Sequence, residues 1–275
     1  MIAHLYATFR KSPRNLTVLS ALIVGALAFP SGAMGDANTP IQLSVGHKNT
    51  CALLSGGKVK CWGDNTYGQV GAGAATTPAY WASPKTVIDL MSGNELSSVT
   101  KVVSGNNHSC ALLSSGAVEC WGSNKFGEML DPTASLDRYY SAYTVSGISS
   151  GAVDIAAGGN FVCAVMSNGT AKCWGQNNSG QLGDGTTVDK NGESPTTVKA
   201  SSSQNQTGVV KITAGAYHAC ALLSSGGLRC WGDNTYGQLG DGTKTDRLYA
   251  TAVSGYSSSG AVEVSANGAA SMTGA

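Results

Sequence analysis

The chain has 275 residues, of which 12% are charged, and a formal net charge of +1. This length allows one large domain or two ordinary ones, and the near-neutral charge excludes the basic surface that a nucleic-acid-binding protein needs. The 37 glycines exceed average usage, but they recur at fixed places and therefore predict tight turns instead of a low-complexity linker.

Residues 1–35 have the order of a secretory signal peptide. Basic residues precede an apolar run at 16–29, and small residues follow it. The run is too short for a membrane-spanning helix, which needs about 20 residues. We expect cleavage near Ala33 or Gly35, and a mature chain of residues 36–275 that is secreted to the periplasm or the extracellular space. An uncleaved N-terminal anchor is the alternative.

After this segment one pattern, C-A-L-L-S-x-G-x-x-x-C-W-G or a looser copy, occurs four times. The copies begin at Cys51, Cys110, Cys163 and Cys220. A period of 50 to 60 residues indicates a repeat architecture. The repeats and the opening of a fifth lie at about 41–90, 98–147, 152–200, 209–255 and 261–275.

The fourth repeat shows what one copy builds. β-rich runs at 209–214, 218–223 and 228–231 are followed by a bend rich in Gly, Asn and Asp at 232–242 and by a last run at 250–254. The second and third runs are joined by a glycine-containing turn and read as a hairpin. Four short strands per repeat, with no helical periodicity, predict an all-β protein of four-stranded antiparallel blades, a β-propeller.

All eight cysteines lie in these repeats, two in each. In a hairpin centred on the glycine turn the two cysteines face each other, close enough for a disulfide after a local twist. Zinc binding is disfavoured because paired zinc ligands have two to four residues between them, and redox-active pairs follow C-x-x-C. We therefore expect four disulfides: Cys51–Cys61, Cys110–Cys120, Cys163–Cys173 and Cys220–Cys230.

The fourth repeat reads G-x-x-H-x-C-A-L and then C-W-G-x-N-x-x-G-Q-L-G-D-G, which resembles the regulator of chromosome condensation repeat family. The match is carried there by Gly215, His218, Trp231, Asn234 and Gln238. It covers about residues 41–255 and implies a propeller, usually of seven blades. The cysteine pairs are not general in the family and suggest an oxidising compartment. In the second repeat Glu128 replaces the glutamine and the last glycines are missing, so we expect its outer bend to be remodelled.

Four complete repeats and a partial fifth are fewer than a seven-bladed ring needs. In the partial repeat Met272 stands where the next cysteine is expected. Three explanations stay open: a truncated product, an open arc or smaller ring, and closure by association of several copies.

No motif predicts catalysis. G-x-S-x-G and H-E-x-x-H are absent, and the glycine-rich bends lack the lysine of a phosphate loop. The segments 64–68 and 233–237 lack the acidic spacing of a calcium loop and indicate turns. We expect no catalytic residue, no cofactor and no metal, and we expect four tryptophans to form core between blades: Trp62, Trp121, Trp174 and Trp231.

Two segments outside the repeated pattern, 74–89 and 131–143, are expected to be surface loops. Aromatic residues and arginine are favoured anchors at protein interfaces, and loops on a rigid scaffold often carry specificity. The candidate partner-binding residues are Tyr80, Trp81, Arg138, Tyr139 and Tyr140. An ordinary surface role is the alternative.

These observations predict an exported, non-enzymatic interaction module. Its partner would be an unidentified protein or a surface glycan, with no nucleic acid, no membrane contact beyond the signal peptide, and self-association if the propeller is incomplete. The family resemblance implies an alternative, a guanine-nucleotide exchange factor for a small GTPase, as the founding members are. A hydrolase or lyase using acidic residues in a propeller channel is a third hypothesis.

Overall fold

A computed structural model describes residues 36–73, 78–133, 136–192, 194–256, 261 and 263–265. The expected signal peptide lies outside the described residues, as does most of the expected fifth repeat. The described residues form strands, turns and bends and contain no helix, which confirms the all-β class.

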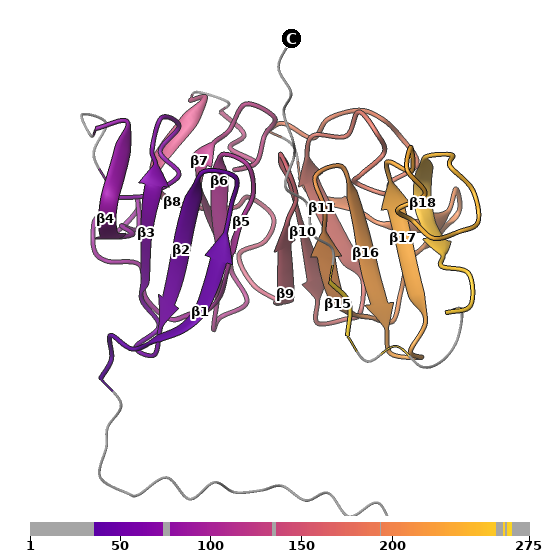
Figure 1. Ribbon diagram of the computed structural model, residues 1–275, viewed down its shortest axis with the longest axis horizontal. Helices are drawn as coiled ribbons and strands as arrows, with labels where there is room; N and C mark the ends of the chain where they lie inside the picture. Colours follow the sequence, from indigo (N-terminus) through magenta and orange to yellow (C-terminus); the bar gives the residue numbers. More distant parts are fainter. Residues whose placement is uncertain are drawn as a thin grey trace, which may run out of the picture. The chain divides into compact units, whose positions relative to one another are not determined.

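Each repeat forms one four-stranded antiparallel sheet, in which the strands follow chain order (Figure 1). Blade 1 contains β1 (Pro40–Val45), β2 (Asn49–Leu54), β3 (Val59–Asp64) and β4 (Tyr80–Thr86). Blade 2 contains β5 (Val99–Ser104), β6 (His108–Leu113), β7 (Val118–Ser123) and β8 (Arg138–Thr144). Blade 3 contains β9 (Ala152–Ala157), β10 (Phe161–Met166), β11 (Ala171–Gly175) and β12 (Thr196–Thr197). Blade 4 contains β15 (Val209–Ala214), β16 (His218–Leu223), β17 (Leu228–Gly232) and β18 (Arg247–Ala252). A small hairpin, β13 (Lys199–Ser201) with β14 (Gln204–Asn205), lies between blades 3 and 4 in the chain.

The two middle strands of each blade form the predicted hairpin. In blade 4, the N–H of Leu223 donates to the carbonyl of Gly227 at 2.9 Å, and the N–H of Gly226 donates to the carbonyl of Leu223 at 2.8 Å. Gly226 has φ of 80°, a conformation that glycine adopts without the steric cost of a side chain. The resulting short loop ends on a left-handed residue, a common hairpin geometry, and it sets the register of the strands.

That register places the two cysteines of every hairpin directly opposite each other. The structure joins them as four disulfides, Cys51–Cys61, Cys110–Cys120, Cys163–Cys173 and Cys220–Cys230. Their Cα atoms are 4.0 to 4.1 Å apart, and all eight residues are buried. Each blade therefore has a covalent link across its two central strands.

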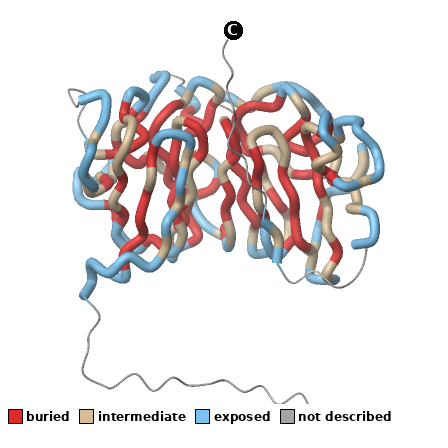
Figure 2. The backbone as a smooth tube through the Cα atoms, viewed as in Figure 1, coloured by how far each residue is buried: buried red, intermediate tan, exposed pale blue. Residues whose placement is uncertain are grey.

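The apolar core lies between successive blades. In the core between blades 3 and 4, the disulfide of blade 3 and Leu182 of its outer bend pack with Ile212 and Trp231 of blade 4. The same arrangement recurs between blades 1 and 2 and between blades 2 and 3. Figure 2 shows the buried segments running along the strands, with exposed connections at the ends. Blades 1 to 3 thus each supply a disulfide to the core that follows them, and blades 2 to 4 each supply a first strand to the core that precedes them.

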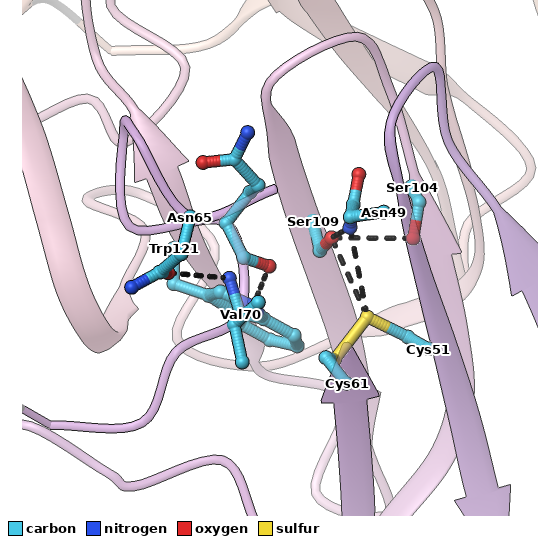
Figure 3. The surroundings of a disulfide bond; sticks show 9 residues. Asn49, Cys51, Cys61, Asn65, Val70, Ser104, Ser109 and Trp121 are labelled. Carbon is cyan, nitrogen blue, oxygen red and sulfur yellow. Dashed lines mark hydrogen bonds between the residues drawn. A yellow bond between two sulfur atoms is a disulfide. The ribbon is translucent and has the colours of Figure 1, made fainter. Parts of the chain in front are cut away.

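A hydrogen bond between tryptophan and bend, which we call the tryptophan contact, joins each pair of blades. The indole N–H of Trp121 donates to the Gln69 carbonyl of blade 1 at 3.0 Å. Figure 3 shows Trp121 in the surroundings of the Cys51–Cys61 disulfide. Equivalent contacts are Trp174 to Glu128 at 2.8 Å and Trp231 to Gln181 at 2.9 Å. These three indoles are fully buried, as expected for core between blades. Trp62, in the first described blade, is only partly buried because no described blade precedes it.

The four described blades do not close into a ring, since contacts between first strands run from β1 to β5, β9 and β15 and do not return to β1. Beyond blade 4, Val264 packs against the Cys220–Cys230 disulfide, as Ile212 packs against the disulfide of blade 3. The N–H of Ala261 donates to the Gly226 carbonyl at 3.3 Å. The described residues of the fifth repeat therefore repeat the contacts that open a blade.

The expected remodelling of the second repeat's bend is wrong for its first half, up to Leu130, and is confirmed at Pro132, where the other three bends have a positive-φ glycine that proline cannot imitate. The N–H of Phe126 donates to the Glu128 carboxyl at 2.9 Å, as the N–H of Tyr67 does to the Gln69 side chain. Leu130 takes the place of a positive-φ glycine and itself has φ of 47°. This conformation is strained for leucine, but the Leu130 side chain is fully buried, and that burial offsets the strain.

Oxidised protein should contain no free thiol, and non-reducing peptide mass mapping should recover the four pairs above. Replacing both Cys163 and Cys173 by alanine should lower the free energy of unfolding by about 2–3 kcal/mol in urea denaturation, because the short loop is no longer closed in the unfolded chain. Eight free thiols in protein recovered from an oxidising compartment would contradict the pairing.

Trp174→Phe should lower the free energy of unfolding by about 1–3 kcal/mol, because it leaves the buried Glu128 carbonyl without a donor. Trp62→Phe is the matched control and should change stability by less than about 0.5 kcal/mol. Equal losses for both variants in urea denaturation would mean that the tryptophan contact does not hold the blades together.

Candidate functional site

The five candidate partner-binding residues lie on the outermost strands and not on loops, so the loop expectation is wrong. Tyr80 and Trp81 open β4, where they pair with Asp64 and Gly63 of β3. Residues 138–140 open β8, where Arg138 and Tyr139 pair with the end of β7. Both segments are rich in aromatic residues, which suit a strand, and they continue the blade instead of leaving it.

Of these residues, Tyr80 and Arg138 are exposed, and Tyr80 is 70% accessible. Trp81 is partly buried, and the Lys85 ammonium lies 4.3 Å from the centre of its ring. Tyr139 is buried, and its hydroxyl donates a short hydrogen bond to Asp131. Tyr139 therefore serves the packing of blade 2.

A surface that spans two blades forms around Arg138. Its guanidinium donates to the Thr66 carbonyl in the bend of blade 1 at 2.9 Å and lies 5.8 Å from the centre of the Tyr67 ring. The same bend begins at Asp64, whose carboxylate accepts from the N–H of Thr66 at 2.7 Å and whose backbone pairs with Tyr80. We call Tyr67, Tyr80 and Arg138 the tyrosine–arginine surface.

Sequence reasoning missed Tyr67 because it treated the whole bend as turn residues. A signal was present: the Asn-Thr-Tyr-Gly of this bend recurs in blade 4, where Tyr236 is 87% exposed. A large aromatic side chain at the tip of a tight bend is expected to face solvent. Arg138 is the partner that distinguishes Tyr67 from Tyr236.

Two titratable groups of blade 2, Glu128 and His108, are fully buried, and burial favours their neutral forms. Burial raises the pKa of Glu128 to about 8 and lowers the pKa of His108 to about 4. Glu128 takes the place of glutamine in the other three bends, and a protonated carboxyl resembles that amide. Among residues 36–265 that the structure describes, no group of three or more His, Cys, Asp and Glu side chains is placed to hold a metal ion.

The blades and their tryptophan contacts define a repeat protein of the β-propeller class. Two models of the regulator of chromosome condensation repeat match the chain, one at residues 41–69, 99–128, 152–181 and 209–238, and the other at residues 56–112 and 168–222. Together these matches span more than half of the chain. The chain belongs to the regulator of chromosome condensation repeat family.

Relatives and solved structures agree with this assignment. The chain is 29% identical over 217 residues to the human E3 ubiquitin-protein ligase HERC2, covering 78% of this chain and 4% of that protein. It is 31% identical over 231 residues to the human probable ligase HERC6, of which it spans 21%. The fold is similar to human WBSCR16, with a TM-score of 0.68, 23% identity, and coverage of 86% of this chain and 57% of the other. Yeast RCC1 (Prp20), solved with Kap60, gives a TM-score of 0.63 at 22% identity and coverage of 83% and 52%.

Glu128→Gln should stabilise the protein at pH 8 and change little at pH 4.5. The pKa of Glu128 is raised on folding from 4.5 to about 8, so its contribution to stability is complete below pH 4.5 and is lost as the pH rises through 8. The gain at pH 8 should be on the order of 1 kcal/mol or more, measured by urea denaturation at both pH values. A variant equally stabilised or destabilised at both would contradict the buried neutral carboxyl.

Proposed function

We propose that the protein is an exported, non-enzymatic interaction module that binds a protein partner through the tyrosine–arginine surface. The observation that carries this proposal is the placement of Arg138 of blade 2 over Tyr67 in the bend of blade 1, with exposed Tyr80 beginning the adjacent strand. Tyrosine and arginine dominate the binding energy of many interfaces, and rigid placement lowers the entropy lost on binding.

The proposal of export rests on covalent chemistry. Four disulfides in one domain are compatible with an extracellular or secreted setting, because reducing compartments keep thiols free. No helix in the part of the chain that the structure describes has the length and apolar character to cross a membrane. The order of residues 1–35 adds support, since it is that of a secretory signal peptide.

Structural neighbours support protein binding as a use of this fold. One structure of yeast RCC1 is a complex with Kap60, and another study of Prp20p concerns its binding to Gsp1p and histones. The chain spans about half the length of these proteins and less of the ligases, so their partners are not carried over to it. Guanine-nucleotide exchange on a small GTPase is the alternative that the experiment must decide.

Partners selected from a library of secreted proteins with the disulfide-bonded protein should bind Tyr80→Ala and Arg138→Ala variants at least about tenfold more weakly, because each loses an interface anchor. Calorimetry or surface plasmon resonance measures the change. A Tyr67→Ala variant should behave alike, whereas Tyr236→Ala, its counterpart in blade 4, should bind as the unaltered protein does.

A parallel assay mixes the purified protein with small GTPases loaded with fluorescent GDP. No acceleration of nucleotide release is expected. Accelerated release would favour the exchange-factor alternative, and partners that ignore the substitutions at Tyr80 and Arg138 would move the binding site elsewhere on the blades.

A further inference from the structure

A polar pocket lies between the connection from β4 to β5 and the hairpin turn of blade 2. Its volume is about 380 Å³. Exposed side chains of both segments form its rim, and the buried Glu119 of β7 forms its inner wall. Its polar lining includes Asp89, Glu95, Ser97, Ser98, Ser115 and Glu119. No lysine or arginine is among the described residues that line it.

Glu119 is the unusual residue of this pocket. It is 7% exposed, and its Oε2 atom has no hydrogen-bond partner among the described residues. Thr144 of β8 pairs with Glu119 across the sheet, and a hydrogen bond between their side chains lowers the pKa of Glu119. A buried carboxylate oxygen without a partner costs free energy, so the pocket holds an acceptor that is not satisfied within the chain.

The neighbouring carboxylates, Asp89 and Glu95, do have partners within the chain. Asp89 accepts from the N–H of Met91 at 2.9 Å and from the Ser92 hydroxyl at 2.7 Å. Glu95 forms an ion pair with Lys58. Asp89 nevertheless acts on Glu119 by like-charge repulsion, which adds to burial in raising the pKa of Glu119 to about 7. A cation entering the pocket would meet one unpaired acid and a negative field.

The other blades show that an acid here is a departure from the repeat. The position of Glu119, immediately before the second cysteine of the hairpin, is occupied by Lys60, Lys172 and Arg229 in the other three repeats. Three blades therefore carry a positive charge where blade 2 carries a negative one. Packing alone does not demand an acid at this position, because the same sheet geometry accepts a base in the other blades.

The backbone beside the pocket is also strained. Ser98 has φ of 60°, and its carbonyl accepts from the N–H of Ser114 at 2.8 Å. In blades 3 and 4 the residues that accept the matching hydrogen bond are glycines, Gly151 and Gly208, which adopt such angles freely. A serine held in this conformation keeps a hydroxyl at the pocket, and strained residues of this kind cluster at ligand sites.

From these observations we propose that the pocket binds the cationic side chain, lysine or arginine, of a protein partner, with the Glu119 carboxylate as its counter-ion and the serine hydroxyls as additional acceptors. The ammonium and guanidinium groups supply only donors, which is what an unpartnered carboxylate oxygen requires. The proposal rests on the proposed function as a protein-binding module and adds a second contact with its own chemistry.

The probes are N-acetyl-arginine amide and N-acetyl-lysine amide, titrated into the full chain by NMR, with N-acetyl-norleucine amide as the uncharged control. Binding of the two cationic probes should be saturable and should shift signals around Glu119, and the norleucine probe should not bind. Affinity should rise about tenfold from pH 6 to pH 8, because the carboxyl group with a pKa of about 7 must lose its proton before it can pair. The other charged groups at the pocket are Asp89 and the Glu95–Lys58 ion pair.

Glu119→Gln should weaken both cationic probes at least about tenfold, and Glu119→Lys, which restores the residue type of the other blades, should abolish binding. The glutamine variant should fold, because it removes a buried charge. Lys172→Gln, at the same position of blade 3, is the matched control and should bind as the unaltered protein does.

Unchanged binding by Glu119→Gln, or equal binding of the norleucine probe, would overturn the proposal. Spermidine or calcium chloride binding more tightly than either amino-acid probe would also overturn it, in favour of a small amine or a metal ion. The probe titrations do not depend on Tyr80 or Arg138, so the pocket proposal can fail while the proposed function stands. That outcome would be a partner whose binding is lost in Arg138→Ala but is unchanged in Glu119→Gln.

Discussion

The structure depends on the core between successive blades, where the disulfide and bend of one blade meet the first strand and the tryptophan of the next. A single blade buries its cysteines and tryptophan only against a neighbour, and repeat proteins gain their stability from such interfaces. The indole N–H of Trp121, Trp174 or Trp231 adds direction to this apolar contact, because it donates to one particular carbonyl of the neighbouring bend. Glu128 stands in blade 2 where the other bends have glutamine, and this contact is kept because the bond uses the backbone carbonyl and not the side chain.

Each proposed binding feature includes one residue at which blade 2 departs from the repeated pattern while the scaffold stays constant. Arg138 reaches from β8 to the bend of blade 1, and Glu119 brings an acid to a position that is basic in the other blades. Neither change disturbs the disulfide or the tryptophan contact of blade 2. A stable interface between blades thus leaves the strand ends and turns free to carry recognition chemistry, as loops do on other rigid scaffolds.

Much of the fold was predictable because its determinants are local. The glycine turn fixes the hairpin register, the register opposes Cys220 to Cys230, and the period of the pattern gives the blades. The start of β8 was not predictable, since its strand character depends on pairing with β7. The positive φ of Leu130 was not predictable either. Sequence patterns assign this conformation to glycine, and here the burial of the leucine side chain outweighs the backbone cost. The proposed role of Glu119 was not predictable, because it depends on a pocket to which residues 89–98 contribute, about 20 to 30 positions earlier in the chain.

Hydrogen exchange of the indole N–H groups, followed by NMR on protein labelled with ¹⁵N at tryptophan, tests the interface between blades most directly. The account predicts that the indoles of Trp121, Trp174 and Trp231 exchange about a hundredfold or more slowly than that of Trp62, because only the first three donate to a buried carbonyl of the preceding blade. Exchange of all four at one rate would contradict the account, since it would mean that the repeated core does not hold each tryptophan against its neighbouring blade.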